Sequence, residues 1–237
     1  MSKEDFDIDA LASYLHLLPK QVSRMADRGK LPGRKVAGKW RFSRSEIHHW
    51  LEERIGAADE DDELARVEGV LERAEDFATD SISLQELLSP AAMAVPLAAR
   101  TRDSVITQMV QLASSTGMLW DAEKMIEAVR AREEMHPTAL SCGVALMHPR
   151  RPIPAILSQP FLAMGRTIQQ IPFGGSQGHL TDIFFLICSD SDHNHLKTLA
   201  RLSRLINDPQ LLDRLRAAPD AQTSYEILVE GDQQLSE

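Results

Sequence analysis

Apolar residues recur at helical spacing twice near the start of the chain, on either side of Pro19, a residue suited to the first position of a helix. The helix that Pro19 opens is predicted to run from Lys20 to Arg28. Alternation of apolar and basic residues over 35–42, around a turn at Gly38, predicts a β-hairpin. Residues 43–46 form a capping box that begins a third helix. The first 56 residues therefore predict three short helices and a hairpin.

From residue 81 onward, helix-periodic stretches alternate with short apolar runs. Strands are predicted at 142–146, 155–163 and 180–188, and Pro160 indicates that the second lies at an edge or carries a bulge. Helices are predicted at 103–115, from Asp121 onward, and at 192–206, 208–217 and 224–229. This alternation predicts an α/β sheet flanked by helices, so the whole chain is expected to be α+β.

Charge divides the chain more sharply than hydropathy does. The net charge of −9 hides an uneven distribution, in which residues 20–44 carry +8, residues 57–80 carry −8 and the residues from 81 on carry −4. We therefore predict a basic N-terminal domain at 1–56, an acidic helical linker at 57–80 and a second domain at 81–237.

The linker carries an apolar seam at spacings of three and four residues. Its members are Leu64, Val67, Leu71, Ala74 and Ala78. A helix this short needs a surface to pack on, since isolated helices of roughly 12 to 15 residues are marginal in water. Two surfaces remain open: a second copy, giving a homodimer through residues 60–78, or the C-terminal domain of the same chain.

Composition narrows the class of protein further. No run approaches the roughly 20 apolar residues of a membrane span, and residues 1–5 lack the order of a signal peptide. We therefore expect a cytoplasmic protein. No cofactor is expected, and no metal site, because the histidines at 148, 193 and 195 have no carboxylate or cysteine at a characteristic ligand spacing.

Polar side chains, all of them basic except one glutamine, are predicted on the outer face of the second helix and on the hairpin. They are Lys20, Gln21, Arg24 and Arg28 on the helix and Lys39 and Arg41 on the hairpin. Such a helix suits the major groove of DNA, and such a hairpin suits phosphates or the neighbouring groove. A merely solvated basic face is the alternative, which nine bases within 20–44 make less favourable.

This segment resembles the excisionase-type, MerR-like winged helix-turn-helix domain. The resemblance covers residues 6–54 and is carried by 11–15, by Gly29-Lys30-Leu31-Pro32 and by Lys39-Trp40-Arg41-Phe42. It implies DNA as a partner, although some domains of this kind bind protein instead.

His148 ends the short apolar run that begins at Cys142, so its imidazole can be presented at a surface as a nucleophile. Arg132 stands sixteen residues earlier, in the run Arg-Glu-Glu-Met-His-Pro-Thr. Neutral imidazole attacks phosphorus readily, and the resulting phosphoramidate retains a high transfer potential.

These residues resemble the type 2 enzyme IIA domain of the phosphoenolpyruvate sugar phosphotransferase system, the mannitol, fructose and nitrogen-regulatory group. The pattern of that group runs R-E-x-x-x-P-T-x-x-x-x-x-A-x-P-H-G, and the resemblance covers residues 81–232, including 173–178, 182–187 and 194–200. It implies a mixed sheet flanked by helices. It also implies phosphorylation of His148 by the histidine-containing phosphocarrier protein, with Arg132 and His195 beside the acceptor.

Two positions depart from the family pattern: Met147 stands where proline is usual and Pro149 where glycine is usual. A degenerate site that senses a partner only by docking therefore remains an alternative. Three functions stay open. They are a phosphorylation-responsive transcriptional regulator that binds DNA, an enzyme IIA phosphocarrier recruited to a protein by its N-terminal module, and a sensor that is never phosphorylated.

Overall fold

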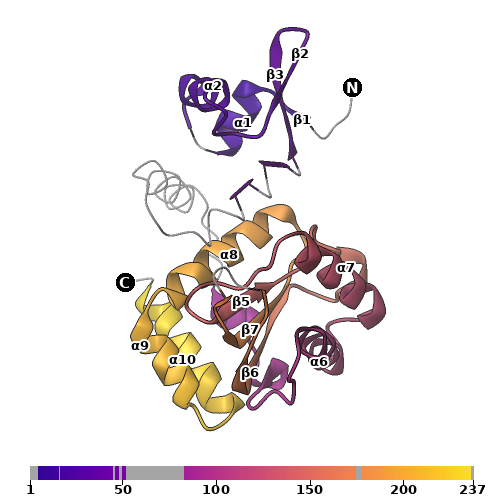
Figure 1. Cartoon of the computed structure of the whole chain (residues 1–237), viewed down its shortest axis with the longest axis vertical. Helices are drawn as coiled ribbons and strands as arrows, with labels where there is room; N and C mark the ends of the chain where they lie inside the picture. The colour runs from indigo at the N-terminus through magenta and orange to yellow at the C-terminus, as the bar shows by residue number, and fades with distance from the viewer. Residues whose placement is uncertain are drawn as a thin grey trace. The chain divides into compact units, whose positions relative to one another are not determined.

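The computed structural model describes residues 5–15, 17–44, 46–47, 50–51, 83–174 and 178–235. The chain divides into two units, Met1–Ser81 and Ile82–Glu237, each shown in Figure 1. The acidic linker predicted at 57–80 and its dimerisation seam lie outside the described residues. Both remain predictions.

In its described part, the N-terminal unit contains the helices α1 and α2, helical residues at 44, 46–47 and 50–51, and a three-stranded antiparallel sheet in the order β1-β3-β2 (Figure 1). Its elements are β1 (Asp5–Phe6), α1 (Ile8–Tyr14), α2 (Pro19–Asp27), β2 (Arg34–Val36) and β3 (Lys39–Ser43). The hairpin of β2 and β3 turns through Ala37 and Gly38, both at positive φ. This backbone matches the right-handed twist of a two-residue hairpin and favours glycine at the second position.

A small apolar core holds this unit together. Its fully buried side chains include Leu11 of α1, Val22 of α2, Phe42 of β3 and Ile47. Val36, although in phase with Phe42 along the hairpin, is half exposed because it borders the turn. The strand β1 has no counterpart among the predicted elements, since two residues are too few to show a period.

The C-terminal unit is built around a four-stranded mixed sheet in the order β4-β6-β7-β5. β6 pairs in parallel with β4 and antiparallel with β7, and β7 pairs in parallel with β5. The strands are β4 (Met93–Ala94), β5 (Val144–Met147), β6 (Phe161–Ile171) and β7 (Thr181–Cys188). The predicted α/β sheet flanked by helices is therefore confirmed.

Helices cover both faces of this sheet, with α6 and α7 on one side and α8, α9 and α10 on the other (Figure 1). Their bounds are α6 (Arg102–Ser115), α7 (Ala122–Met135), α8 (Asp192–Ile206), α9 (Pro209–Ala217) and α10 (Ala221–Gln234); α5 (Leu84–Leu87) and the 3-10 turns η1 (Pro90–Ala92) and η2 (Pro154–Ile156) are shorter. All eight residues of β7 are buried. A strand covered on both faces is expected to be a nearly continuous apolar run, as residues 183–188 are.

Pro160 does not mark an edge strand, so the edge alternative is wrong, whereas the bulge alternative agrees with the register shift that β6 carries between Arg166 and Ile171. β6 begins at Phe161, one residue after the proline, and lies inside the sheet between β4 and β7. Proline lacks the N–H that a ladder requires, and here it stands just outside the ladder. The residues before it, 154–156, form the turn η2 instead of a strand.

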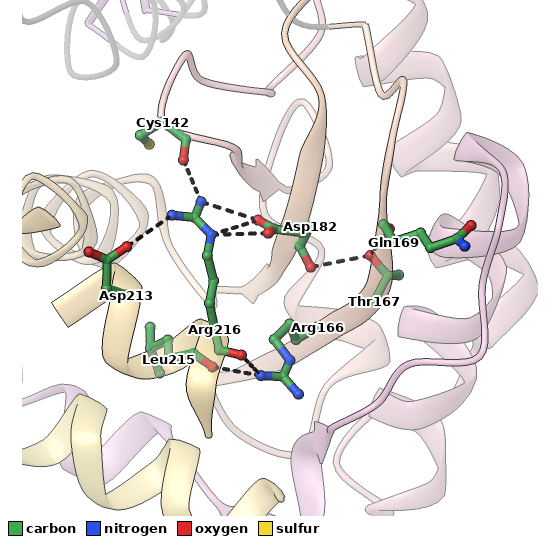
Figure 2. A network of polar contacts seen from close by, with 8 residues as sticks. All are labelled: Cys142, Arg166, Thr167, Gln169, Asp182, Asp213, Leu215 and Arg216. Carbon is green, nitrogen blue, oxygen red and sulfur yellow. Dashed lines mark hydrogen bonds and ion pairs between the residues drawn. The ribbon is translucent and has the colours of Figure 1, made fainter. Parts of the chain in front are cut away.

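A polar cluster fastens α9 to the sheet at the end of β5 opposite His148 (Figure 2). The Arg216 guanidinium lies 3.0 Å from Asp182 Oδ2 and donates to the Cys142 carbonyl oxygen at 2.7 Å. Arg166 of β6 donates to the carbonyl oxygens of Leu215 and Arg216. Helix C-terminal carbonyls need such donors, because no further turn of helix satisfies them.

Gly143 makes room for this cluster. Its φ is +86°, and a Cβ at this position would lie 2.8 Å from the Arg216 terminal nitrogen. Both the backbone conformation and the close contact therefore require glycine at the start of β5.

Among the described residues, no helix combines the length and the apolar character needed to cross a membrane.

Candidate functional site

The end of β5 places His148 in a fixed orientation. Its ring nitrogen Nδ1 lies 2.8 Å from the Leu146 carbonyl oxygen. A carbonyl oxygen only accepts, so Nδ1 carries the hydrogen and donates it. In the neutral ring the lone pair then belongs to Nε2, which makes Nε2 the nucleophilic atom.

His195 lies against His148. It belongs to the first turn of α8, which Ser191 caps by accepting from the Asn194 backbone N–H. The two imidazole centroids are 4.7 Å apart, with the ring planes tilted by 60°. Thus β5 and the N-terminal end of α8 bring together two histidines that are 47 positions apart in the sequence.

Both histidines are buried, with His148 only 3% and His195 only 2% exposed. The sequence had suggested an imidazole at the surface, because a residue that ends a strand often meets solvent. Here the residues on either side of His148, Met147 and Pro149, are buried as well. A phosphoryl donor can reach Nε2 only if the side chains around it move.

Arg132 lies in the last turn of α7 and is also buried. Its terminal nitrogen donates to the His136 carbonyl oxygen at 2.6 Å. That hydrogen bond fixes the guanidinium to the segment that follows α7, and this segment runs alongside β5: Ala139 bridges to Ala145.

Glu133, the next residue, is an acid that sequence reasoning did not single out. Its carboxylate is 1% exposed and accepts hydrogen bonds from both the backbone N–H and the hydroxyl of Thr138. Arg102, at the first position of α6, forms an ion pair with it at 3.4 Å. The signal was present, because Glu133 and Thr138 are the second and last letters of the R-E-x-x-x-P-T motif.

Burial raises the pKa of the Glu133 carboxyl above its ordinary value, although the Thr138 hydrogen bonds and the positive charges of Arg102 and His148 oppose the shift. Its ionised form is therefore costly in the fold, since a charge loses hydration when buried.

Among the described residues, no group of three or more histidine, cysteine, aspartate or glutamate side chains could hold a metal ion. His193 is exposed, unlike His195 two residues later on α8.

The predicted DNA-contacting residues of α2 are exposed, with one exception. The side chains of Lys20, Arg24 and Arg28 are exposed. Within the described part of the chain, none of these side chains has an ion-pair or hydrogen-bond partner. Gln21 is only half exposed, and its side-chain oxygen accepts from the Leu18 backbone N–H at 2.9 Å, capping the helix. This oxygen is therefore engaged inside the unit.

On the hairpin, Lys39 is exposed, whereas Arg41 lies half-buried with its guanidinium 3.7 Å from Asp7. The tip of the hairpin thus presents Lys39, and the base of the hairpin holds Arg41 against α1.

Comparison with known proteins agrees with the description of both the C-terminal and the N-terminal unit. A mixed sheet flanked by helices, with the His148 and His195 rings side by side at one end of β5, defines the C-terminal unit as an α/β domain. The chain belongs to the family described as phosphoenolpyruvate-dependent sugar phosphotransferase system, EIIA 2, whose model matches residues 86–231. A second model, described as helix-turn-helix domain, matches residues 6–55.

The similar proteins include both nitrogen regulatory proteins and fructose-specific components of the phosphotransferase system. A nitrogen regulatory protein of Bradyrhizobium diazoefficiens is 29% identical over 148 residues, covering 61% of this chain and 94% of the relative. A nitrogen regulatory protein of Pseudomonas aeruginosa is 26% identical over 151 residues, covering 63% and 96%.

Solved structures show the same fold for the C-terminal unit. The nitrogen regulatory protein IIA-Ntr of Neisseria meningitidis superimposes with a TM-score of 0.55 at 20% identity, covering 61% of this chain and 98% of that one. The IIA mannitol protein of Escherichia coli gives 0.53 at 16% identity, covering 60% and 98%.

Proposed function

We propose that this chain is a DNA-binding regulator controlled by phosphorylation of His148. The winged helix-turn-helix domain at 1–56 would bind DNA, the acidic segment at 57–80 would connect the domains, and the EIIA domain at 81–237 would receive the phosphoryl group. The observation that carries this proposal is the His148 ring, whose Nδ1–H is held by the Leu146 carbonyl so that the nucleophilic lone pair belongs to Nε2, in a ring that lies beside His195.

The chemistry balances as a transfer between two histidines. The Nε2 lone pair of His148 forms a bond to phosphorus while the phosphorus–nitrogen bond of the donor phosphohistidine breaks. The hydrogen on Nδ1 stays in place, so the phosphorylated ring is positively charged. A loose phosphoryl transition state needs donors for its equatorial oxygens. His195, and Arg132 after a small movement, are the side chains proposed for this role.

Similarity to proteins named nitrogen regulatory proteins favours regulation over sugar uptake. The proposed donor is the histidine-containing phosphocarrier protein of the phosphotransferase system or its nitrogen-branch counterpart. The proposed DNA contacts are the three exposed bases of α2, Lys20, Arg24 and Arg28, together with Lys39 at the hairpin tip.

The first experiment incubates the full chain with phosphoenolpyruvate, enzyme I and the phosphocarrier protein. We expect its mass to rise by one phosphoryl group and the label to be acid-labile and base-stable. His148→Ala should abolish the label, whereas His179→Ala, which replaces an exposed histidine of the same domain, should retain it. Label that survives in His148→Ala would assign the acceptor elsewhere.

The second experiment measures binding of the full chain to genomic DNA fragments at low salt. Arg24→Ala should weaken binding and change the sequence preference, whereas Lys39→Ala should weaken binding to all sequences and lower the salt slope by about one counterion. A chain that accepts phosphate but binds no DNA would instead fit a phosphocarrier recruited to a protein partner.

A further inference from the structure

We infer that Glu133 is a positioning residue for His148: through Thr138 and Leu146 it holds the imidazole in the tautomer that leaves Nε2 as the nucleophile. The inference deepens the proposed function, and its rate measurements rest on that function. It starts from a continuous chain of hydrogen bonds that joins three segments of the C-terminal unit.

The chain of bonds begins at the Glu133 carboxylate, in the last turn of α7. One oxygen accepts from the Thr138 hydroxyl, and the other accepts from the Thr138 backbone N–H at 3.1 Å. Two bonds from one residue to one carboxylate fix both the backbone and the side chain of Thr138. The loop between α7 and β5 is thereby held at the point where it meets the strand.

Thr138 passes this constraint to β5. Its carbonyl oxygen accepts from the Leu146 backbone N–H at 3.2 Å. The Leu146 carbonyl oxygen in turn accepts from His148 Nδ1 at 2.8 Å. Each peptide group in such a series polarises the next, so a displacement of Thr138 weakens the bond that selects the tautomer.

Two further contacts brace the acid. Arg102 of α6 lies 3.4 Å from the Glu133 carboxylate, and its guanidinium sits 5.7 Å from the centre of the Phe173 ring. A Cβ on Gly174 would approach Pro137 to 2.9 Å, so the loop after β6 packs directly on the residue before Thr138. Three elements therefore converge on this short segment, which has no other evident need for a buried carboxylate.

A buried glutamate is an expensive way to hold a loop, because an apolar side chain would avoid the desolvation cost. The carboxylate does what an apolar side chain could not: it accepts two hydrogen bonds at fixed directions from one residue. We take this as the reason for an acid at position 133.

The test uses paired variants that keep or remove the bonds. Glu133→Gln and Thr138→Ser preserve an acceptor and a hydroxyl, respectively, whereas Glu133→Ala and Thr138→Val remove them. Glu134→Ala, an exposed acid one position along α7, is the matched control. Thermal unfolding of every variant identifies any that does not fold, and Thr138→Val keeps its backbone N–H for the carboxylate if Glu133→Ala is lost.

The first readout is the ¹⁵N chemical shifts of the His148 ring in the unphosphorylated full chain. We expect the wild type, Glu133→Gln, Thr138→Ser and Glu134→Ala to show Nδ1–H alone, and Glu133→Ala and Thr138→Val to show a mixture with Nε2–H. This measurement needs no phosphoryl donor, so it judges the inference even if the proposed function is wrong.

The second readout is the rate of phosphorylation at varied phosphocarrier concentration. The two disrupting variants should lose about tenfold in the maximal rate with little change in KM, because the nucleophile is misaligned while the docking surface is intact. Folded Glu133→Ala and Thr138→Val proteins with wild-type ring shifts would overturn the inference. A wild-type chain that takes no label would overturn the proposed function alone.

Discussion

The buried carboxyl of Glu133, which is next to Arg132 in the sequence, makes the free energy of unfolding depend on pH. Because burial raises the pKa of Glu133 above its ordinary value of 4.5, the protonated form is favoured in the fold relative to the unfolded chain. The stability that Glu133 contributes is therefore fully present below the ordinary value and is lost as pH rises through the raised pKa. Arg102 and His148 are the charged groups that face it.

We predict that Glu133→Gln loses this dependence. Its free energy of unfolding should fall less than that of the wild type as pH rises from just below the ordinary glutamate value to slightly alkaline conditions, since the amide has no charge to bury. Urea denaturation over that series measures the difference. Glu134→Gln should follow the wild type, because that residue is exposed. A wild-type curve parallel to that of Glu133→Gln would contradict the assignment.

The sequence indicated the candidate site residues more directly than the residues that support them. His148 and Arg132 stand in a recognisable motif, and His195 follows from the same resemblance. That Glu133 is buried, or that Gln21 caps its own helix, depends on tertiary contacts that no local pattern contains. From the sequence alone, a charged residue at the end of an amphipathic helix is expected to be solvated, because the position of the loop that follows is not known.

At the scale of elements, Asp27 connects α2 to the hairpin of β2 and β3. It ends α2 and accepts from the Trp40 indole N–H at 3.2 Å, and Lys35 lies 3.4 Å from the same carboxylate oxygen and 4.9 Å above the Trp40 ring. Asp27 is also the only acid within 20–44. The net charge and the contacts of Asp27 therefore predict opposite effects on DNA binding when its carboxylate is removed.

We predict that Asp27→Ala weakens DNA binding, by about threefold to tenfold, because the loss of roughly 1 kcal/mol of hydrogen bonding frees the hairpin from α2. If charge alone mattered, removing an acid from a basic surface would tighten binding. Fluorescence anisotropy at two salt concentrations distinguishes the two. The control is Asp9→Ala, which removes an exposed acid of the same unit. Tighter binding by Asp27→Ala would show that the hairpin needs no such anchor.

Gly143 offers a comparable test in the C-terminal unit. Gly143→Ala should lower the free energy of unfolding by about 1–3 kcal/mol from backbone strain, and further through its contact with Arg216. Gly117→Ala is the matched control, because that glycine also has a positive φ, +76°, but faces open space. Equal losses in denaturant unfolding would mean that Arg216 simply moves aside.

Helical periodicity predicted α6, α8 and α9 to within a residue or so, because each has a continuous apolar face and a clear capping residue. The strand pattern was less informative. β6 continues to Ile171 through polar residues such as Arg166 and Gln169, which interrupt the apolar run. Its place inside the sheet is set by pairing with β4 and β7, and pairing partners are not visible in a single strand's sequence.

At the scale of the whole molecule, the point where the chain enters the C-terminal unit is tied to the helix that carries His195. Asp232 of α10 accepts from the Leu84 backbone N–H at 2.9 Å, at the start of α5, and from Arg201 Nε of α8 at 2.6 Å. This buried ion pair connects α8 to the first residues that follow the acidic segment. A displacement of α8 at the histidine pair can therefore be passed, through the Arg201–Asp232 ion pair, to the residues that follow the acidic segment.

We predict that phosphorylation of His148 weakens DNA binding. It adds a net charge of about −1 to a chain whose net charge is already −9, because the positively charged ring offsets part of the negative charge of the phosphoryl group, and negative charge is repelled by the phosphates of DNA. Anisotropy titrations of the phosphorylated chain and of mock-treated His148→Ala at two salt concentrations measure the change. Exposed charges more than about 8 Å apart are screened at physiological salt, so a loss that vanishes there comes from charge, and one that persists comes from a conformational change. The same titration on a Leu64→Lys, Leu71→Lys variant, with its mass in sedimentation, shows whether pairing through 60–78 contributes. Tighter binding after phosphorylation would reverse the sign of the proposed control.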